Sequence, residues 1–131
     1  MKKYGLLSLL LLVALPSLAQ STCPVQPTLV KNISSRISID FQNTSGKQLA
    51  SYRFGLTFFG NNGESHSFPQ PLVGRVPLQA HKHRAAIWET PYALQFLYPV
   101  AEVYLKQATF TDGTIWNDDG SKACKVTSIQ E

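Results

Sequence analysis

Two segments in the first half of the chain alternate between apolar and polar residues. They are SRISIDFQN at 35–43 and QLASYRFGLTFFG at 48–60. The apolar positions that share one side are Ile37, Ile39 and Phe41 in the first segment and Tyr52, Phe54, Leu56 and Phe58 in the second. Period-two alternation of β-branched and aromatic residues is typical of a strand that buries one face. We therefore expect two half-buried strands joined by a turn at 43–47.

Several shorter segments also have the composition of strands. They are ESHSF at 64–68, PLVGRVPL at 71–78, HRAAIWE at 83–89, AEVYLKQATF at 101–110, TIW at 114–116 and ACKVTSI at 123–129. The prolines of PVQP at 24–27 favour extended backbone. TPYALQFLYP at 90–99 is compatible with a short helix capped by Thr90 or with a loop.

The spacing of these strands defines the fold class. About seven to eight short strands, about 8–15 residues apart and without a helix long enough to form a layer, predict an all-β, antiparallel immunoglobulin-like β-sandwich. No internal repeat, linker or low-complexity segment divides the sequence. We expect a single domain over residues 20–131.

The first nineteen residues have the layout of a secretory signal peptide. Lys2 and Lys3 precede an apolar run of about ten residues, and small residues lead up to Ala19. This run is too short to span a bilayer, which requires about 20 residues. We expect cleavage after Ala19, a mature chain of 112 of the 131 residues without a transmembrane segment, and a secreted or periplasmic location.

Charge and cysteine content refine this picture. Removing Lys2 and Lys3 from the twelve basic residues leaves ten against eight acidic ones, a net charge of +2 spread along the chain. A nucleic-acid partner is therefore not expected. The two cysteines of an exported chain predict a disulfide between Cys23 and Cys124. Lipid attachment at Cys23 is disfavoured because Thr22, rather than a smaller residue, precedes it.

The segment at 39–64 resembles the small immunoglobulin-like domains of FxLYD type found in exported bacterial proteins. The matching positions are Phe41, Asn43, Ser45, Gly46, Lys47, Leu56, Phe58, Phe59 and Gly63. The chain departs from that pattern in reading Phe-Phe-Gly-Asn where those domains favour an aromatic residue followed by Asp. The resemblance implies a sandwich fold and a binding or accessory role, and it carries over no catalytic residue.

Three carboxylates crowd into TFTDGTIWNDDG at 109–120, namely those of Asp112, Asp118 and Asp119. Asp112-Gly113 lies between two expected strands and predicts a two-residue type I′ hairpin turn, and 117–120 reads as a second turn. An EF-hand alignment would place Ile115 and Val126 at ligand positions, which neither side chain can fill. We interpret these carboxylates as turn residues, with an acid–base or metal role as the alternative.

Histidine and aromatic side chains are the other candidates for chemistry. His81 and His83 in HKHR would lie on one side of a strand, a spacing that metals use, but zinc needs three or four ligands and His66 is the only other histidine. We interpret HKHR as a solvated basic turn and expect no metal. The aromatic residues considered for binding are Trp88, Trp116, Tyr92, Phe96, Tyr98 and Tyr104. For most of them we expect core packing. The segment YALQFLYP at 92–99 departs from strand alternation and is the best candidate for an exposed aromatic patch.

These observations favour a non-catalytic role without a cofactor. There is no G-x-S-x-G motif and no phosphate-binding glycine loop. We expect an exported binding or accessory module whose protein or glycan partner contacts HKHR and YALQFLYP at 92–99. One alternative is a small periplasmic hydrolase or metal-binding protein that uses His81, His83 and nearby carboxylates. Another is a structural component of an envelope assembly. The sequons at Asn32 and Asn43 are expected to be unmodified.

Overall fold

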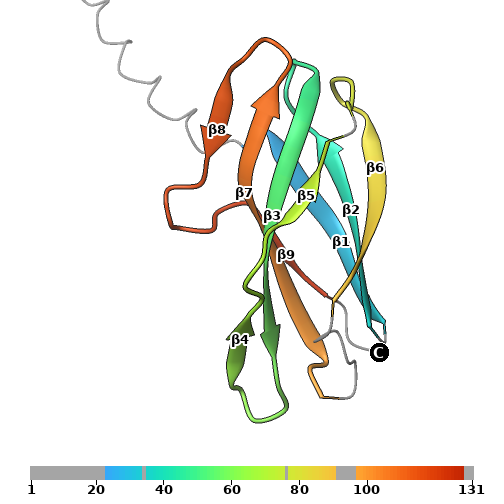
Figure 1. Ribbon diagram of the computed structural model, residues 1–131, viewed down its shortest axis with the longest axis vertical. Helices are drawn as coiled ribbons and strands as arrows, with labels where there is room; N and C mark the ends of the chain where they lie inside the picture. The colour runs from blue at the N-terminus through green and yellow to red at the C-terminus, as the bar shows by residue number, and fades with distance from the viewer. Residues whose placement is uncertain (1–22, 34, 76, 91–96, 129–131) are drawn as a thin grey trace, which may run out of the picture.

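A computed structural model describes residues 23–33, 35–75, 77–90 and 97–128 of the chain. These residues form nine strands in two antiparallel sheets and contain no helix (Figure 1). Within these ranges, accordingly, no helix is long and apolar enough to cross a membrane. The expected signal peptide at 1–19 and the segment 91–96, on which the choice between helix and loop depends, lie outside the described residues.

One sheet has the strand order β1-β2-β6. Its strands are β1 (Val25–Ile33), β2 (Arg36–Asn43) and β6 (His83–Glu89). β2 lies in the middle because it pairs with β1 through a short turn and with β6 through a long connection. The register between β1 and β2 shifts at Pro27/Leu29. This irregularity follows from proline, which has no backbone N–H to donate.

The other sheet is built around two long central strands, β3 (Leu49–Phe59) and β7 (Val100–Phe110). Four strands of three residues each complete its edges. β4 (Ser65–Ser67) and β5 (Leu72–Gly74) pair with β3, whereas β8 (Ile115–Asn117) and β9 (Lys125–Thr127) pair with β7.

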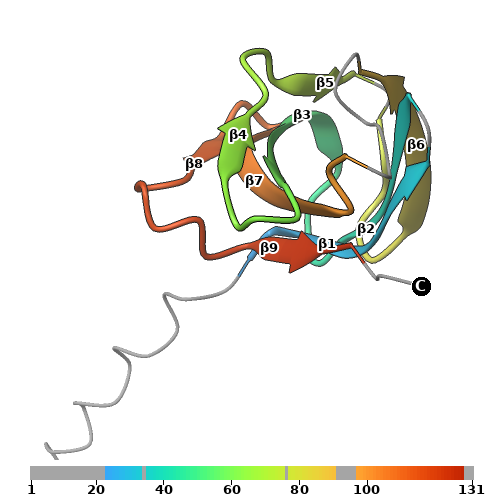
Figure 2. The same cartoon turned by 90° about the horizontal axis from the view of Figure 1, so that it is seen from below.

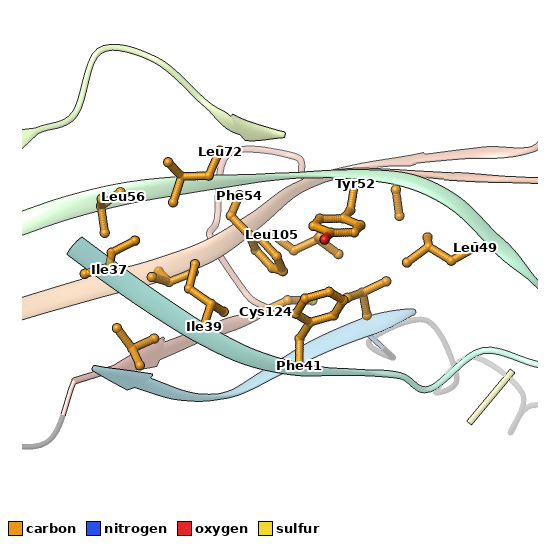
Figure 3. Close-up of a cluster of buried hydrophobic side chains, with 14 of the residues drawn as sticks. Ile37, Ile39, Phe41, Leu49, Tyr52, Phe54, Leu56, Leu72, Leu105 and Cys124 are labelled. Carbon is orange, nitrogen blue, oxygen red and sulfur yellow. The ribbon is translucent and has the colours of Figure 1, made fainter. Parts of the chain in front are cut away.

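The core lies between the sheets and is rich in aromatic residues (Figure 3). The Phe41 ring from β2 contacts Tyr52 and Phe54 from β3, with centroid distances of 4.6 and 5.3 Å. All seven apolar positions that the alternation of 35–43 and 48–60 assigns to one side are buried. The expected burial of these two faces is confirmed. β3 is more deeply buried than a half-buried strand, because Gly55 and Thr57 on its other side are buried as well.

The buried polar residue Asn43 links the turn after β2 to the segment that leads from β5 to β6. Asn43 is fully buried, and its Nδ2 atom lies 2.8 Å from the Lys47 carbonyl oxygen and 3.0 Å from that of Leu78. Its Oδ1 atom accepts a hydrogen bond from the Ser45 hydroxyl at 2.7 Å. Asn43, Ser45 and Lys47 belong to the motif on which the family resemblance rests. Their role here is to hold the 43–47 turn in place.

The structure confirms the antiparallel β-sandwich, and the immunoglobulin-like class remains a prediction. The described residues contain nine strands instead of the expected seven to eight. The additional strand is β1, which was expected only to be extended because of its prolines. It tolerates Pro27 because it is an edge strand with a bulge at that residue.

The predicted disulfide between Cys23 and Cys124 is present, with a Cα–Cα distance of 5.7 Å. Cys23 precedes β1 of one sheet, and Cys124 precedes β9 of the other. Figure 2 shows these two edge strands side by side at one side of the sandwich. The bond therefore ties the two sheets together where their edges meet.

Candidate binding surfaces

The hairpin between β7 and β8 is a three-residue loop, so the expected two-residue type I′ turn is wrong. The Gly113 N–H donates to the Phe110 carbonyl at 2.9 Å, and the Phe110 N–H donates to the Thr114 carbonyl at 2.9 Å. A type I′ turn requires positive φ at both central residues. Here Gly113 has φ of +92°, and Asp112 is not among the positive-φ residues. This is the pattern of a tight turn that ends in a left-handed glycine.

The Asp112 carboxylate is bonded within this turn. Its Oδ1 atom accepts hydrogen bonds from the Thr114 hydroxyl (2.6 Å) and the Thr114 N–H (3.0 Å), and its Oδ2 atom lies 3.2 Å from Lys47 Nζ. The Thr114 hydrogen bonds, supported by the Lys47 ammonium, lower the pKa of Asp112 from 3.8 to about 2. These contacts agree with the interpretation of Asp112 as a turn residue.

The two following aspartates have the same role in the next turn. Asp118 accepts hydrogen bonds from the backbone N–H groups of Gly120 (2.9 Å) and Lys122 (3.1 Å). Asp119 accepts one from the Ser121 N–H at 3.0 Å. Hydrogen bonding to Ser121, through its side chain and its backbone, lowers the pKa of Asp119. Both carboxylates thus stabilise backbone geometry between β8 and β9.

The two histidines of HKHR do not lie on one strand face, contrary to the sequence-based expectation. His81 is in a turn with φ of +66°, and its N–H donates to the Asn43 carbonyl at 2.7 Å. Only His83 belongs to β6. His66 is on β4 of the other sheet, with its ring 5.1 Å from that of Tyr98. Among the described residues, no group of three or more His, Cys, Asp or Glu residues could hold a metal ion.

Of the aromatic residues in YALQFLYP, Tyr98 lies at the edge of the core, and the others lie outside the described residues. Tyr98 is half-buried, and its ring lies 5.9 Å from that of Phe58. Its carbonyl accepts a hydrogen bond from Asn32 Nδ2 at 2.6 Å. The prediction that Tyr98 belongs to an exposed aromatic patch is therefore wrong. Tyr92 and Phe96 lie outside the described residues.

HKHR and residues 97–98 lie at opposite ends of β6 (Figure 1). A strand of seven residues is about 20 Å long at about 3.3 Å per residue. HKHR and residues 97–98, the described part of the aromatic segment near its end, are therefore separated by about the length of β6. What lies between them is β6 and the outer face of the sheet to which it belongs.

On the outer face of the β1-β2-β6 sheet, side chains from the three strands lie in cross-strand rows. This surface was not predicted from the sequence. The register places Lys31, Ser38 and Ile87 in one row and Ile33, Arg36 and Glu89 in the next. Ile33 and Ile87 are exposed by 53% and 60%, respectively. They flank polar and charged side chains from β2. We define the outer face by these six residues.

The sequence carried only a weak signal for this surface. In β6, the adjacent residues Ile87 and Trp88 are both apolar, and alternation alone does not tell which of them is inside. The structure points Trp88 inward, with its ring 6.5 Å from Tyr52 and 6.3 Å from Phe54. Ile87 is exposed on the opposite side as a consequence. Which of the two residues points inward depends on which side chain can fill the space beside the aromatic rings of β3.

Comparison of the chain with models of known protein families and with curated proteins gave no match. The resemblance to FxLYD-type domains therefore stays a prediction.

Proposed function

We propose that the chain is an exported, non-catalytic binding module that contacts a protein partner through the outer face of the β1-β2-β6 sheet. The observation that carries this proposal is the exposure of two isoleucines, Ile33 and Ile87, on one sheet face. Single exposed apolar residues are normal on protein surfaces. Two on the same face, close to Arg36 and Glu89, have the mixed composition of a protein–protein contact area.

The rest of the sandwich supports a role for this face. The inner sides of both sheets are filled by the core, so they are not accessible to a partner. On the other sheet, the half-buried Tyr104 ring covers the outer side of Gly55 on the neighbouring strand, and Lys122 Nζ lies 4.9 Å from its centroid. On the face of the β1-β2-β6 sheet, by contrast, Ile33 and Ile87 are exposed by 53% and 60%.

Export is the second part of the proposal. It is supported by the order of Lys2, Lys3, an apolar run and small residues before Ala19, and by the disulfide at Cys23, since such bonds persist in oxidising compartments. N-terminal sequencing of the protein recovered from the producing cell's exterior or periplasm should begin at Gln20. A mature protein that still carries Met1 or a lipid on Cys23 would contradict this part.

The binding surface can be tested by site-specific photo-crosslinking in cells. A photoreactive residue at Ile33 should give a discrete protein adduct, whereas one at Ile115 on β8 of the other sheet should not. Ile115 is a matched control because it is 57% exposed, close to the 53% of Ile33. Replacing Arg36 by Glu should then reduce the Ile33 adduct. The same adduct from both positions would contradict the assignment of the face.

The non-catalytic part has its own test. The purified protein should show no turnover in a panel of esterase, amidase, glycosidase and phosphatase substrates, with and without added zinc. The informative variant is His81→Ala. Turnover that disappears in His81→Ala, while the melting temperature is unchanged, would replace this proposal by the hydrolase alternative.

A further inference from the structure

The strand edges of the sandwich differ in how well they are protected against pairing with another chain. An unprotected edge offers unpaired backbone N–H and C=O groups, and proteins block such edges with short strands, prolines, bulges or lysines. β4, β5, β8 and β9 have three residues each. β1 contains Pro27 and a bulge. Each of these five strands thus has a feature that limits pairing.

β6 has none of these protections. It is seven residues long, HRAAIWE, without Pro, Gly or Lys, and its register with β2 is unbroken. Among the described residues, β2 is the only strand that pairs with it. Its inward side chains are fixed to the rest of the molecule: Trp88 Nε1 lies 3.4 Å from the Val73 carbonyl oxygen, and Arg84 donates to the Pro77 carbonyl at 3.0 Å. The strand is therefore held in place, and no strand among the described residues pairs with its outer edge.

The ends of the β2–β6 ladder show which backbone groups point to the open edge. At one end the Asn43 N–H donates to the Lys82 carbonyl, and at the other the Thr90 N–H donates to the Ser35 carbonyl, both at 2.9 Å. In an antiparallel ladder, hydrogen-bonded positions alternate with positions whose groups point away. The residues whose N–H and C=O point away from β2 are His83, Ala85, Ile87 and Glu89.

These four residues match the same four residues of a second copy when the two β6 strands run antiparallel. If two copies of β6 pair antiparallel with Ala86 on the two-fold axis, His83 lies opposite Glu89 and Ala85 opposite Ile87. Each contact occurs twice, once on either side of the axis. The side chains of all four residues are exposed on the same sheet face. The register therefore matches a basic or polar group with a carboxylate, a small side chain with a large one, and every outward N–H with a C=O.

We propose that β6 is a self-association edge, through which two copies of this chain form a dimer with a continuous six-stranded sheet of order β1-β2-β6-β6-β2-β1. The contact is isologous, so it closes at two copies and does not propagate into a fibre. It involves one strand per copy and is smaller than the roughly 1,200 Å² of a stable interface. The dimer is accordingly concentration-dependent. This inference goes beyond the proposed partner-binding function and does not rest on it.

Sedimentation equilibrium of the purified, disulfide-bonded protein at concentrations from about 10 µM to about 1 mM tests the proposal. The wild-type protein should change from monomer to dimer over this range. Ile87→Lys places a lysine on the open edge and should weaken dimerisation about tenfold or more. Ile33→Lys is the matched control, because Ile33 is a similarly exposed isoleucine on the opposite edge of the same sheet. It should dimerise like the wild type.

A charge exchange tests the register. Glu89→Lys places a lysine opposite His83 of the second copy and should weaken the dimer. Adding His83→Glu restores an opposite-charge pair at both sites and should return the dissociation constant to within about threefold of the wild type. In hydrogen exchange, the amides of Ala85 and Ile87 should become protected as the concentration rises. The amides of Ala108 and Val103 in the central strand β7 should not change.

Three outcomes would overturn the proposal. The first is a wild-type protein that stays monomeric to about 1 mM. The second is an equal effect of Ile87→Lys and Ile33→Lys, which would place the contact elsewhere. The third is loss of dimerisation in Glu89→Lys that His83→Glu does not restore, which would exclude this register. Because all of these measurements use the purified chain alone, they leave the photo-crosslinking result at Ile33 unaffected, and the two ideas can fail separately.

Discussion

Gly113 adopts a backbone conformation that other residues rarely adopt. Its φ of +92° lies in the left-handed region, where an L side chain is strained. A Cβ atom at this position would have no heavy atom within 4 Å. Any cost of adding a side chain there consequently comes from the backbone and not from a clash.

Gly113→Ala should therefore lower the free energy of unfolding by about 1–2 kcal/mol. Gly46→Ala is the control, since a Cβ at Gly46 is equally free of contacts and its φ is not positive. That variant should lie within about 0.5 kcal/mol of the wild type. Urea unfolding of both variants provides the measurement. Equal effects of the two substitutions would show that the turn does not depend on the left-handed glycine.

Asp112 makes stability depend on pH through the same turn. Its pKa in the folded chain is about 2, below the usual 3.8, because the carboxylate accepts hydrogen bonds from Thr114 and lies beside Lys47. A lowered pKa means that the contribution is complete above about pH 4 and is lost as the pH falls toward 2. Asp112→Asn should be slightly less stable than the wild type at pH 7. The difference should shrink between pH 4 and 2 in urea unfolding, and a difference that does not depend on pH would contradict this account.

At the scale of elements, two tyrosines each cover a glycine on the neighbouring strand. Tyr52 of β3 lies directly opposite Gly74 of β5, and Tyr104 of β7 lies opposite Gly55 of β3. A Cβ at Gly74 would come within 2.1 Å of the Tyr52 ring, and one at Gly55 within 2.3 Å of the Tyr104 ring. In both places the glycine, which has no side chain, makes room for the tyrosine ring of the neighbouring strand.

The two glycines should nevertheless differ in their tolerance of alanine. Tyr52 is 3% exposed and packs against Phe41, so it cannot move aside without disturbing the core. Tyr104 is half-buried and can swing toward solvent. Gly74→Ala should lower the free energy of unfolding by about 2–3 kcal/mol and Gly55→Ala by about 1 kcal/mol or less. Thermal and urea unfolding would detect this order, and the reverse order would contradict it.

For the molecule as a whole, the disulfide and the outer edge of β6 lie at opposite edges of the β1-β2-β6 sheet. The bond between Cys23 and Cys124 ties β1 to the second sheet, whereas β6 forms the opposite edge of the β1-β2-β6 sheet. This single bond joins two residues that are 101 positions apart in the sequence. Loss of the bond should lower the stability of the whole fold without altering the edge through which we propose that two copies associate.

Cys23→Ala with Cys124→Ala should lower the free energy of unfolding by about 3–5 kcal/mol, the range expected for a loop of about 100 residues. Reduction of the wild-type protein should add the mass of two hydrogens and lower the melting temperature in the same direction. If the double variant still folds, its dimerisation should match that of the wild type. Two thiols that are freely alkylatable without reductant would contradict the presence of the bond.

The sequence by itself determined which sides of the main strands are buried. In 35–43 and 48–60, alternation places every second residue on one face, and burial of an apolar face needs no knowledge of the partner strand. The same holds for the turn role of Asp112, Asp118 and Asp119, whose side chains bond to backbone groups two to four residues away. The disulfide was predictable because the chain is expected to be exported and its two cysteines leave one pairing.

Only the tertiary structure decided how these elements are combined. The turn at Asp112-Gly113 has three residues because it must match the end of the pairing between β7 and β8, which the dipeptide does not specify. His81 leaves the strand because its N–H is held by Asn43, 38 positions away in the sequence. Tyr98 packs on Phe58, and Trp88 excludes Ile87 from the core, because of rings contributed by distant strands. Local patterns set which side of a strand is buried, whereas non-local packing set which apolar side chains stay exposed and which strands lie at the edges of the described sheets.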